Sequence, residues 1–83
     1  MGNVICIYEI LPDSPESLGK VKKGLEELKP ESIEEVPIAF GLKSLTVKIV
    51  IPEEDGALDS IENKLNDIDG VTSVELKHST RAL

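Results

Sequence analysis

Two stretches of the chain carry the same helical pattern of hydrophobic residues, forty positions apart. In each stretch, large aliphatic residues recur at the spacing of one helix face. They are Leu18, Val21, Leu25 and Leu28 in the first stretch, and Leu58, Ile61, Leu65 and Ile68 in the second. Upstream of each helix an apolar run ends in a proline followed by an acidic residue, at 10–13 and 50–53. The repeat predicts two copies of the order strand, helix, strand.

Polar residues and helix breakers set the predicted ends of the two helices. Ser14 is a favourable N-cap for the first helix, and Glu54 or Asp55 can serve the second. Pro30 and Gly70, again forty residues apart, are expected to stop the helices.

Four apolar segments are expected to form strands, at 4–11, 32–39, 45–51 and 71–78. The first and third are almost continuously apolar, whereas the second and fourth carry charged residues, which predicts that the first and third are central. The order β-α-β-β-α-β predicts an α+β, ferredoxin-like split βαβ sandwich, with a four-stranded antiparallel sheet and both helices on one face. Alternation separates Cys6 and Tyr8 from Ile5 and Ile7, but leaves open which side faces the helices.

Length and charge limit the possible functions. The chain has 83 residues, enough for one domain spanning 1–83. Nine Lys plus Arg against sixteen Asp plus Glu give a net charge of −7, which disfavours direct binding to nucleic acid or to anionic membranes. Cys6 is the only cysteine, so we expect a buried, inert thiol, consistent with the reducing cytoplasm. No signal peptide or transmembrane span is expected.

The residues with potential chemistry favour no catalytic, metal or cofactor site. There is no Cys-x-x-Cys pair for a soft metal and no aromatic platform for RNA, and Arg81 is the only arginine. His78 has no nucleophile at a recognisable spacing. The acidic run 53–55 is more simply explained by a helix dipole than by a bound cation. We therefore expect neither an enzyme nor a cofactor-binding protein.

Residues 36–45 place an aromatic residue at a tight reversal between two strands. Gly41 can take the positive φ that such a turn often requires, and Pro37 stiffens the approach. Phe40 either contacts a partner or packs on its own core, and the residues alone leave both possibilities open.

The pattern Pro-Ile-x-Phe-Gly-Leu-Lys-x-Leu in this segment resembles the signature of the nucleotide-exchange domain of translation elongation factor 1-beta, above all its archaeal type. The resemblance implies a cytoplasmic guanine-nucleotide exchange factor without covalent chemistry. Its implied partner is elongation factor 1-alpha, in the GDP-bound and nucleotide-free forms. Phe40, with Gly41 and Lys43 of the same pattern, is implied to contact the GTPase.

The C-terminus adds a second group of candidate residues. Eukaryotic members of the family end in a lysine followed by leucine, which reaches toward the magnesium and phosphate region of the GTPase. This chain keeps Leu83 but has Ala82 in place of the lysine. Arg81 and Lys77 are therefore the candidate cations, with Phe40 as a wedge beside the phosphate-binding loop.

A different class of function also fits the predicted fold. A small regulatory module could bind a metabolite or self-associate through the sheet face that lacks helices, with Phe40 capping the core. This alternative does not account for the whole pattern from Pro37 to Leu45.

Overall fold

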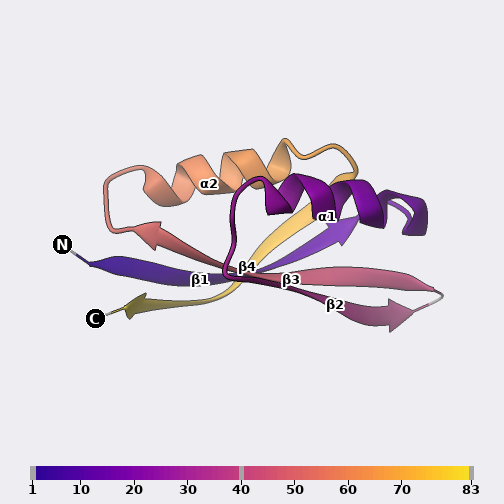
Figure 1. Cartoon of the computed structure of the whole chain (residues 1–83), viewed down its shortest axis with the longest axis horizontal. Helices are drawn as coiled ribbons and strands as arrows, with labels where there is room; N and C mark the ends of the chain where they lie inside the picture. The colour runs from indigo at the N-terminus through magenta and orange to yellow at the C-terminus, as the bar shows by residue number, and fades with distance from the viewer. Residues whose placement is uncertain (1, 40, 83) are drawn as a thin grey trace.

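A computed structural model describes residues 2–39 and 41–82. Its elements are β1 (Asn3–Pro12), a 3₁₀ turn η1 (Pro15–Ser17), α1 (Leu18–Glu26), β2 (Ser32–Ala39), β3 (Leu42–Pro52), α2 (Ala57–Asn66) and β4 (Val71–Ala82). The sheet order is β2-β3-β1-β4, every neighbouring pair is antiparallel, and both helices cover one face (Figure 1). The predicted α+β, ferredoxin-like fold and the central positions of the first and third strands are confirmed.

The hydrophobic core lies between the helices and the two central strands. Its buried residues are Cys6, Tyr8, Ile10, Val21, Leu25, Leu45, Val47, Ile49, Ile51 and Leu65. The side of β1 that carries Cys6 and Tyr8 therefore faces the helices. The Tyr8 hydroxyl donates a hydrogen bond to Glu62 on α2 at 3.0 Å, which satisfies its one polar atom. Burial, followed by this bond, raises the pKa of Tyr8 above its ordinary value.

The predicted start of the first helix holds in position, and that of the second needs correction. Ser14 occupies the N-cap position of the 3₁₀ turn that runs into α1, but it makes no side-chain capping bond, and its hydroxyl lies 3.1 Å from the Ser17 hydroxyl instead. The residue before α2 is Gly56, with φ of 79°, rather than Glu54 or Asp55. A glycine adopts this left-handed conformation without steric cost, so it can place the chain at the helix start.

The end of the first helix also differs from the prediction. The α-helix ends at Glu26, ahead of Pro30, and Lys29 has φ of 53°. A left-handed residue cannot continue an α-helix, so the chain turns away from the helical path before the proline.

The fourth strand is longer than expected and contains a bulge. It continues past His78 to Ala82, and its residues pair with β1 up to Asn3. Lys77 is the extra residue, because Leu76 pairs with Tyr8 and His78 pairs with Ile7. The polar residues 79–81 give no strand signal, but an exposed edge strand tolerates them when its neighbour offers backbone partners.

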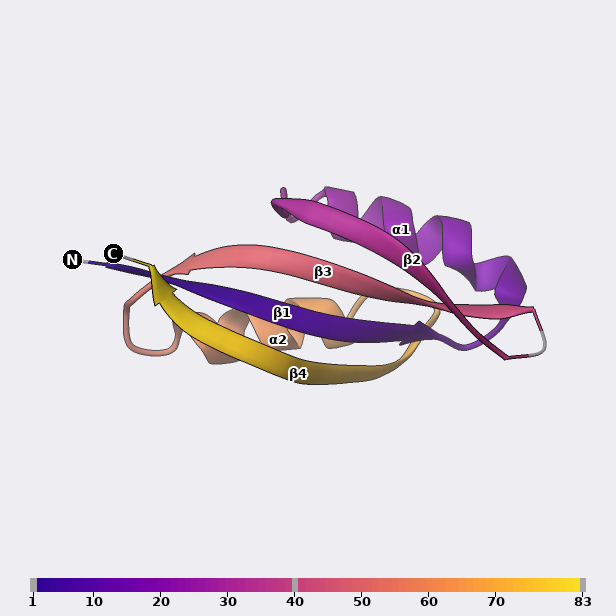
Figure 2. The same cartoon turned by 90° about the horizontal axis from the view of Figure 1, so that it is seen from below.

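The molecule is elongated, with principal extents of 43 × 20 × 17 Å. Both views place the two chain termini at one end of the long axis and the adjoining ends of β2 and β3 at the other (Figures 1 and 2). We call the first region, formed by residues 4–6, 51–58 and 79–81, the terminal end. We call the second, formed by residues 36–39 and 41–43, the hairpin end.

Candidate functional site

The hairpin end exposes apolar side chains around a tight turn. Ala39 pairs with Leu42, so the connection consists of residues 40 and 41, and Gly41 has the expected positive φ, 77°. Val36 is 38% exposed and Ile38 49% exposed. Phe40 lies outside the described residues, so both predictions for its side chain remain predictions.

The lysine of the hairpin end is tethered by an acidic residue on β2. Lys43 Nζ lies 3.4 Å from one carboxylate oxygen of Glu35, and Lys22 Nζ on α1 lies 3.1 Å from the other. Hydrogen bonds from Lys22 first, and from Lys43 second, hold the pKa of Glu35 below its ordinary value. Exposed pairs of this kind are screened by solvent, so Lys43 can exchange Glu35 for a partner's acid at little cost.

Arg81 stands at the terminal end. On β4 it pairs with Val4 of β1, and its guanidinium forms an ion pair with Glu53, just after β3. The backbone N–H of Glu53 donates to the carbonyl of Gly2 at 3.0 Å, which ties this loop to the start of β1. The Arg81 side chain remains 67% exposed, so its charge is available to a partner. Leu83, the other candidate of the C-terminus, lies outside the described residues.

Lys77 belongs to neither end. It occupies the bulge in the middle of β4, where its Nζ lies 3.2 Å from Glu75 and 3.8 Å from Glu9. The hydrogen bond to Glu75, and then the charges of both acids, raise the pKa of Lys77. Lys77 therefore lies apart from Arg81, the cation of the terminal end.

The terminal end also contains a pocket of about 220 Å³ beside Arg81. Its apolar lining comes from Val4, Cys6, Ile51, Pro52 and Leu58, and its polar lining from Ser79 and the acidic run 53–55. Cys6 is fully buried, as predicted, and burial followed by the charge of Glu62 raises the pKa of its thiol. Leu58 is 39% exposed although it opens the second helical repeat.

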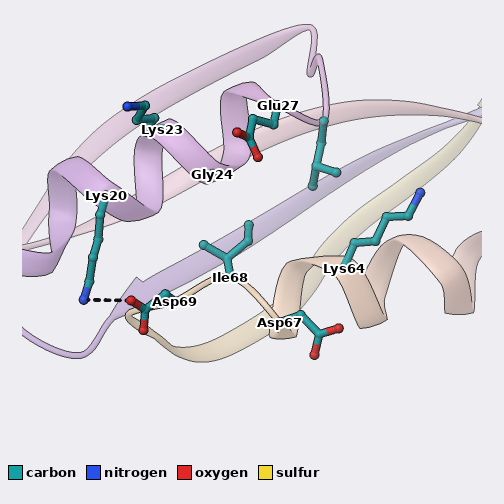
Figure 3. A pocket seen from close by; sticks show the side chains of 9 residues that line it. Lys20, Lys23, Gly24, Glu27, Lys64, Asp67, Ile68 and Asp69 are labelled. Carbon is teal, nitrogen blue, oxygen red and sulfur yellow. Dashed lines mark hydrogen bonds and ion pairs between the residues drawn. The ribbon is translucent and has the colours of Figure 1, made fainter.

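A wider groove of about 480 Å³ separates the two helices on the covered face of the sheet (Figure 3). Its rim mixes three lysines with three acids: Lys20, Lys23 and Lys64 with Glu27, Asp67 and Asp69. Lys20 and Asp69 are paired across it at 3.3 Å. A Cβ on Gly24 would lie 2.8 Å from Cγ2 of Ile68, so glycine allows α1 to approach the loop after α2. The balanced rim favours neither an anionic nor a cationic ligand.

Histidine and the acidic residues form no recognisable reaction centre in the described chain. His78 Nε2 lies 2.8 Å from the Thr80 hydroxyl on the exposed edge strand. Across residues 2–39 and 41–82, no three His, Cys, Asp or Glu side chains converge on a possible metal position. None of the helices in these ranges has the length and apolar character needed to span a membrane.

The described candidate residues therefore do not converge: Gly41 and Lys43 lie at the hairpin end, Arg81 lies at the terminal end, and Lys77 lies between them. Arg81 pairs with Val4, which pairs with Ile51, and Lys43 lies eight residues before Ile51 along β3. At about 3.3 Å per residue, the Cα atoms of Lys43 and Ile51 are about 26 Å apart along β3, so the backbones of Lys43 and Arg81 lie near opposite ends of the sheet. The sequence alone had no means of showing this separation, because it required the full register of β1, β3 and β4.

Sequence reasoning also missed the acidic partners of the candidate cations. Glu75 is only two residues from Lys77, a spacing that signals same-side neighbours on a strand. By contrast, Glu53 and Arg81 are 28 residues apart and meet only through strand pairing. Glu35 forms ion pairs with Lys22 on α1 and Lys43 on β3, and no local sequence pattern indicates that these residues meet.

A comparison with known proteins gives the family. The model of the EF-1 guanine nucleotide exchange domain matches residues 5–81, almost the whole chain. The chain belongs to this family. The match confirms the resemblance seen in residues 37–45 and assigns the protein to guanine-nucleotide exchange in translation elongation.

Curated relatives agree over nearly their full lengths. Elongation factor 1-beta of Korarchaeum cryptofilum is 40% identical, covering 98% of this chain and 95% of the relative. Elongation factor 1-beta of Methanoculleus marisnigri is 42% identical, covering 96% and 98%. That of Methanothermobacter thermautotrophicus is 35% identical, and the match covers both chains completely. The similarity to these relatives therefore extends over nearly the whole chain, not only over the hairpin motif.

Proposed function

We propose that this protein binds the GTPase elongation factor 1-alpha in the cytoplasm, accelerates release of GDP and lets GTP enter. The observation that carries the proposal is the match of residues 5–81 to the EF-1 guanine nucleotide exchange domain. The proposed partner is bound in its GDP-loaded and nucleotide-free forms, and no covalent bond is made or broken.

Thermodynamic linkage supplies the mechanism. A protein that binds the empty GTPase more tightly than the loaded one weakens nucleotide binding by the same factor. GDP in such GTPases is held by backbone amides of a glycine-rich loop, by a lysine and by Mg²⁺. Exchange therefore requires that the factor contact the GTPase more favourably when the glycine-rich loop, the lysine or Mg²⁺ has moved away from its GDP-binding position.

The candidate residues lie at two ends of an elongated molecule, which limits which of them can contact the phosphate region of the GTPase. Mg²⁺ contacts the phosphates directly, and Arg81 lies at the opposite end of the sheet from Gly41 and Lys43, so the two ends are suited to different surfaces of the partner. The terminal end carries Arg81, whose guanidinium suits phosphate oxygens and carboxylate ligands of a metal. The hairpin end exposes Val36 and Ile38 and suits an apolar anchor. We assign Arg81 to the phosphate region and Phe40 with Lys43 to a second surface of the partner.

The test measures release of fluorescently labelled GDP from the cognate elongation factor 1-alpha by stopped flow, over a range of Mg²⁺ concentrations. The variants are Arg81→Lys, Arg81→Gln and a chain that lacks residues 81–83. Lys23→Gln, an exposed position on α1, removes the same charge away from both ends and serves as the control.

The wild type and Lys23→Gln should accelerate GDP release equally. Arg81→Lys should retain most of the acceleration, while Arg81→Gln and the truncated chain should lose about tenfold, the order expected for one charge-assisted hydrogen bond. If the wild type leaves GDP release unchanged, the exchange proposal is wrong for this partner. If the truncated chain and Arg81→Gln both release GDP as fast as the wild type does, the C-terminus is passive and exchange depends on the hairpin end.

A further inference from the structure

The pocket at the terminal end is built before any partner arrives. Val4 and Cys6 of β1 and Ile51 of β3 supply its apolar side, and Leu58 of α2 forms a wall that remains 39% exposed. The loop between β3 and α2 is held by the hydrogen bond from the Glu53 amide to Gly2. The space is therefore bounded by the sheet, a helix and a tethered loop.

The two halves of the repeat differ at the first position of their helical patterns. Leu18 opens the first helical repeat and is half-buried against the core. Leu58, forty residues later, opens the second and stays exposed beside the pocket. At the same helical position, Leu18 packs against the core in the first half, whereas Leu58 in the second half lines the pocket and can contact a partner.

The rim of the pocket is negative. Glu53, Glu54 and Asp55 line it, and Arg81 pairs with Glu53. Within residues 2–39 and 41–82, no ion pair links Glu54 or Asp55 to a cation. An occupant that combines an apolar group with positive charge complements both the lining and the rim.

We infer that this pocket receives an apolar side chain of the partner GTPase that is flanked by a lysine or arginine. The inference rests on the proposed function and adds the kind of partner segment that the terminal end recognises. The apolar side chain packs against Val4, Pro52 and Leu58, and its basic neighbour faces Glu54 and Asp55. The pocket adjoins Arg81, so the same docking event orients the guanidinium toward the phosphate region.

A filling substitution tests the apolar part. Ser79 is exposed on edge strand β4, pairs with Cys6 and lines the pocket, so Ser79→Phe fills the space from its open side. Ser73→Phe is the matched control, because Ser73 is exposed on the same strand but pairs with Leu11 on the helix-free face. Calorimetric titration with nucleotide-free elongation factor 1-alpha should show affinity lowered about tenfold or more by Ser79→Phe and unchanged by the control, as for loss of one buried anchor.

A charge reversal tests the basic part. Asp55→Lys changes the rim, while Asp67→Lys makes the same change beyond the far end of α2, outside this pocket. Asp55→Lys should weaken binding several-fold, mainly by slowing association, and the loss should shrink in high salt. Asp67→Lys should bind as the wild type does.

A spectroscopic measurement does not depend on any variant. In methyl-labelled wild-type protein, the Leu58 and Ile51 resonances should shift when elongation factor 1-alpha is added, and Val36 should shift independently as part of the hairpin end. Two outcomes would overturn the pocket inference and leave the exchange function standing. The first is normal GDP release while the Leu58 and Ile51 methyl resonances do not shift. The second is normal GDP release together with full affinity in a folded Ser79→Phe variant. Absence of binding by the wild type overturns both the pocket inference and the exchange function. Concentration-dependent shifts of the same methyl groups without partner would assign the pocket to a second copy of the chain and also overturn the inference.

Discussion

The hairpin end and the terminal end differ in how the chain builds them. The hairpin end comes from one stretch of the sequence, of which residues 36–39 and 41–43 are described, and Gly41 lies at its turn. The terminal end combines three segments, residues 4–6, 51–58 and 79–81, that lie far apart in the sequence. A surface made from one segment keeps its pattern in the sequence, whereas one made from three exists only when the sheet register is complete.

The two ends also differ chemically. Exposed apolar side chains, Val36 and Ile38, dominate the hairpin end, and its lysine is shared with Glu35. The terminal end instead holds an exposed guanidinium beside an apolar pocket with an acidic rim. This division suits an anchor at one end and a charged contact at the other, and it yields four predictions about the independence and design of the ends.

The largest expected effect is that of the double variant Phe40→Ala/Arg81→Gln on binding to nucleotide-free elongation factor 1-alpha. Its loss should equal the sum of the single losses within about 0.5 kcal/mol, because Arg81 lies at the opposite end of the sheet from Ala39 and Gly41, the residues that flank position 40. The sum should be about 3 to 4 kcal/mol, for one aromatic anchor and one charge-assisted hydrogen bond. A double-mutant cycle by calorimetry measures it, and a coupling above about 1 kcal/mol would show that the two ends act as one site.

Phe40→Ala alone should weaken partner binding by about 2 kcal/mol, roughly thirtyfold, and leave thermal stability nearly unchanged. Val74→Ala is the opposite control, because Val74 packs against the core on β4. It should lower the melting temperature without changing the affinity of the folded protein. If Phe40→Ala instead loses about 3 to 5 kcal/mol of unfolding free energy, the phenylalanine packs on its own core.

Two glycine substitutions isolate the backbone requirement of the hairpin end. A Cβ added at Gly41 or at Gly19 meets no atom within 4 Å, so only backbone conformation distinguishes them. Gly41→Ala should destabilise the fold by about 1 kcal/mol, because φ is 77° there. Gly19→Ala, inside α1, should stabilise it by up to about 1 kcal/mol. Urea denaturation compares the two, and equal effects would rule out strain at the turn as the cause.

The smallest effect concerns pH and the Glu35 bridge of the hairpin end. The pKa of this carboxyl group is lowered in the folded state by Lys22 and Lys43, so its contribution to stability is present above its ordinary pKa of 4.5. The contribution is lost as the pH falls through the lowered folded value. Glu35→Gln should therefore reduce the melting temperature slightly near neutral pH and converge with the wild type in acid. Parallel melting curves at all pH values would contradict the bridge.

The sequence by itself determined the fold class, the central strands and the family. The forty-residue repeat and the apolar strands specify which elements form, since helix and strand periodicities are local properties of the chain. The hairpin motif was visible for the same reason, and the positive φ of Gly41 follows from the turn that it occupies.

Only the tertiary structure decided how far β4 continues, which face of β1 is buried and what surrounds Arg81. The strand extends beyond His78 because β1 supplies backbone partners up to Asn3, although residues 79–81 carry no strand signal. The same pairing brings Arg81 to Glu53 and Ser79 to Cys6, and so forms the terminal end at the opposite end of the sheet from Lys43. Contacts between residues that are distant in sequence depend on strand register, and register is a property of the assembled sheet rather than of any one segment.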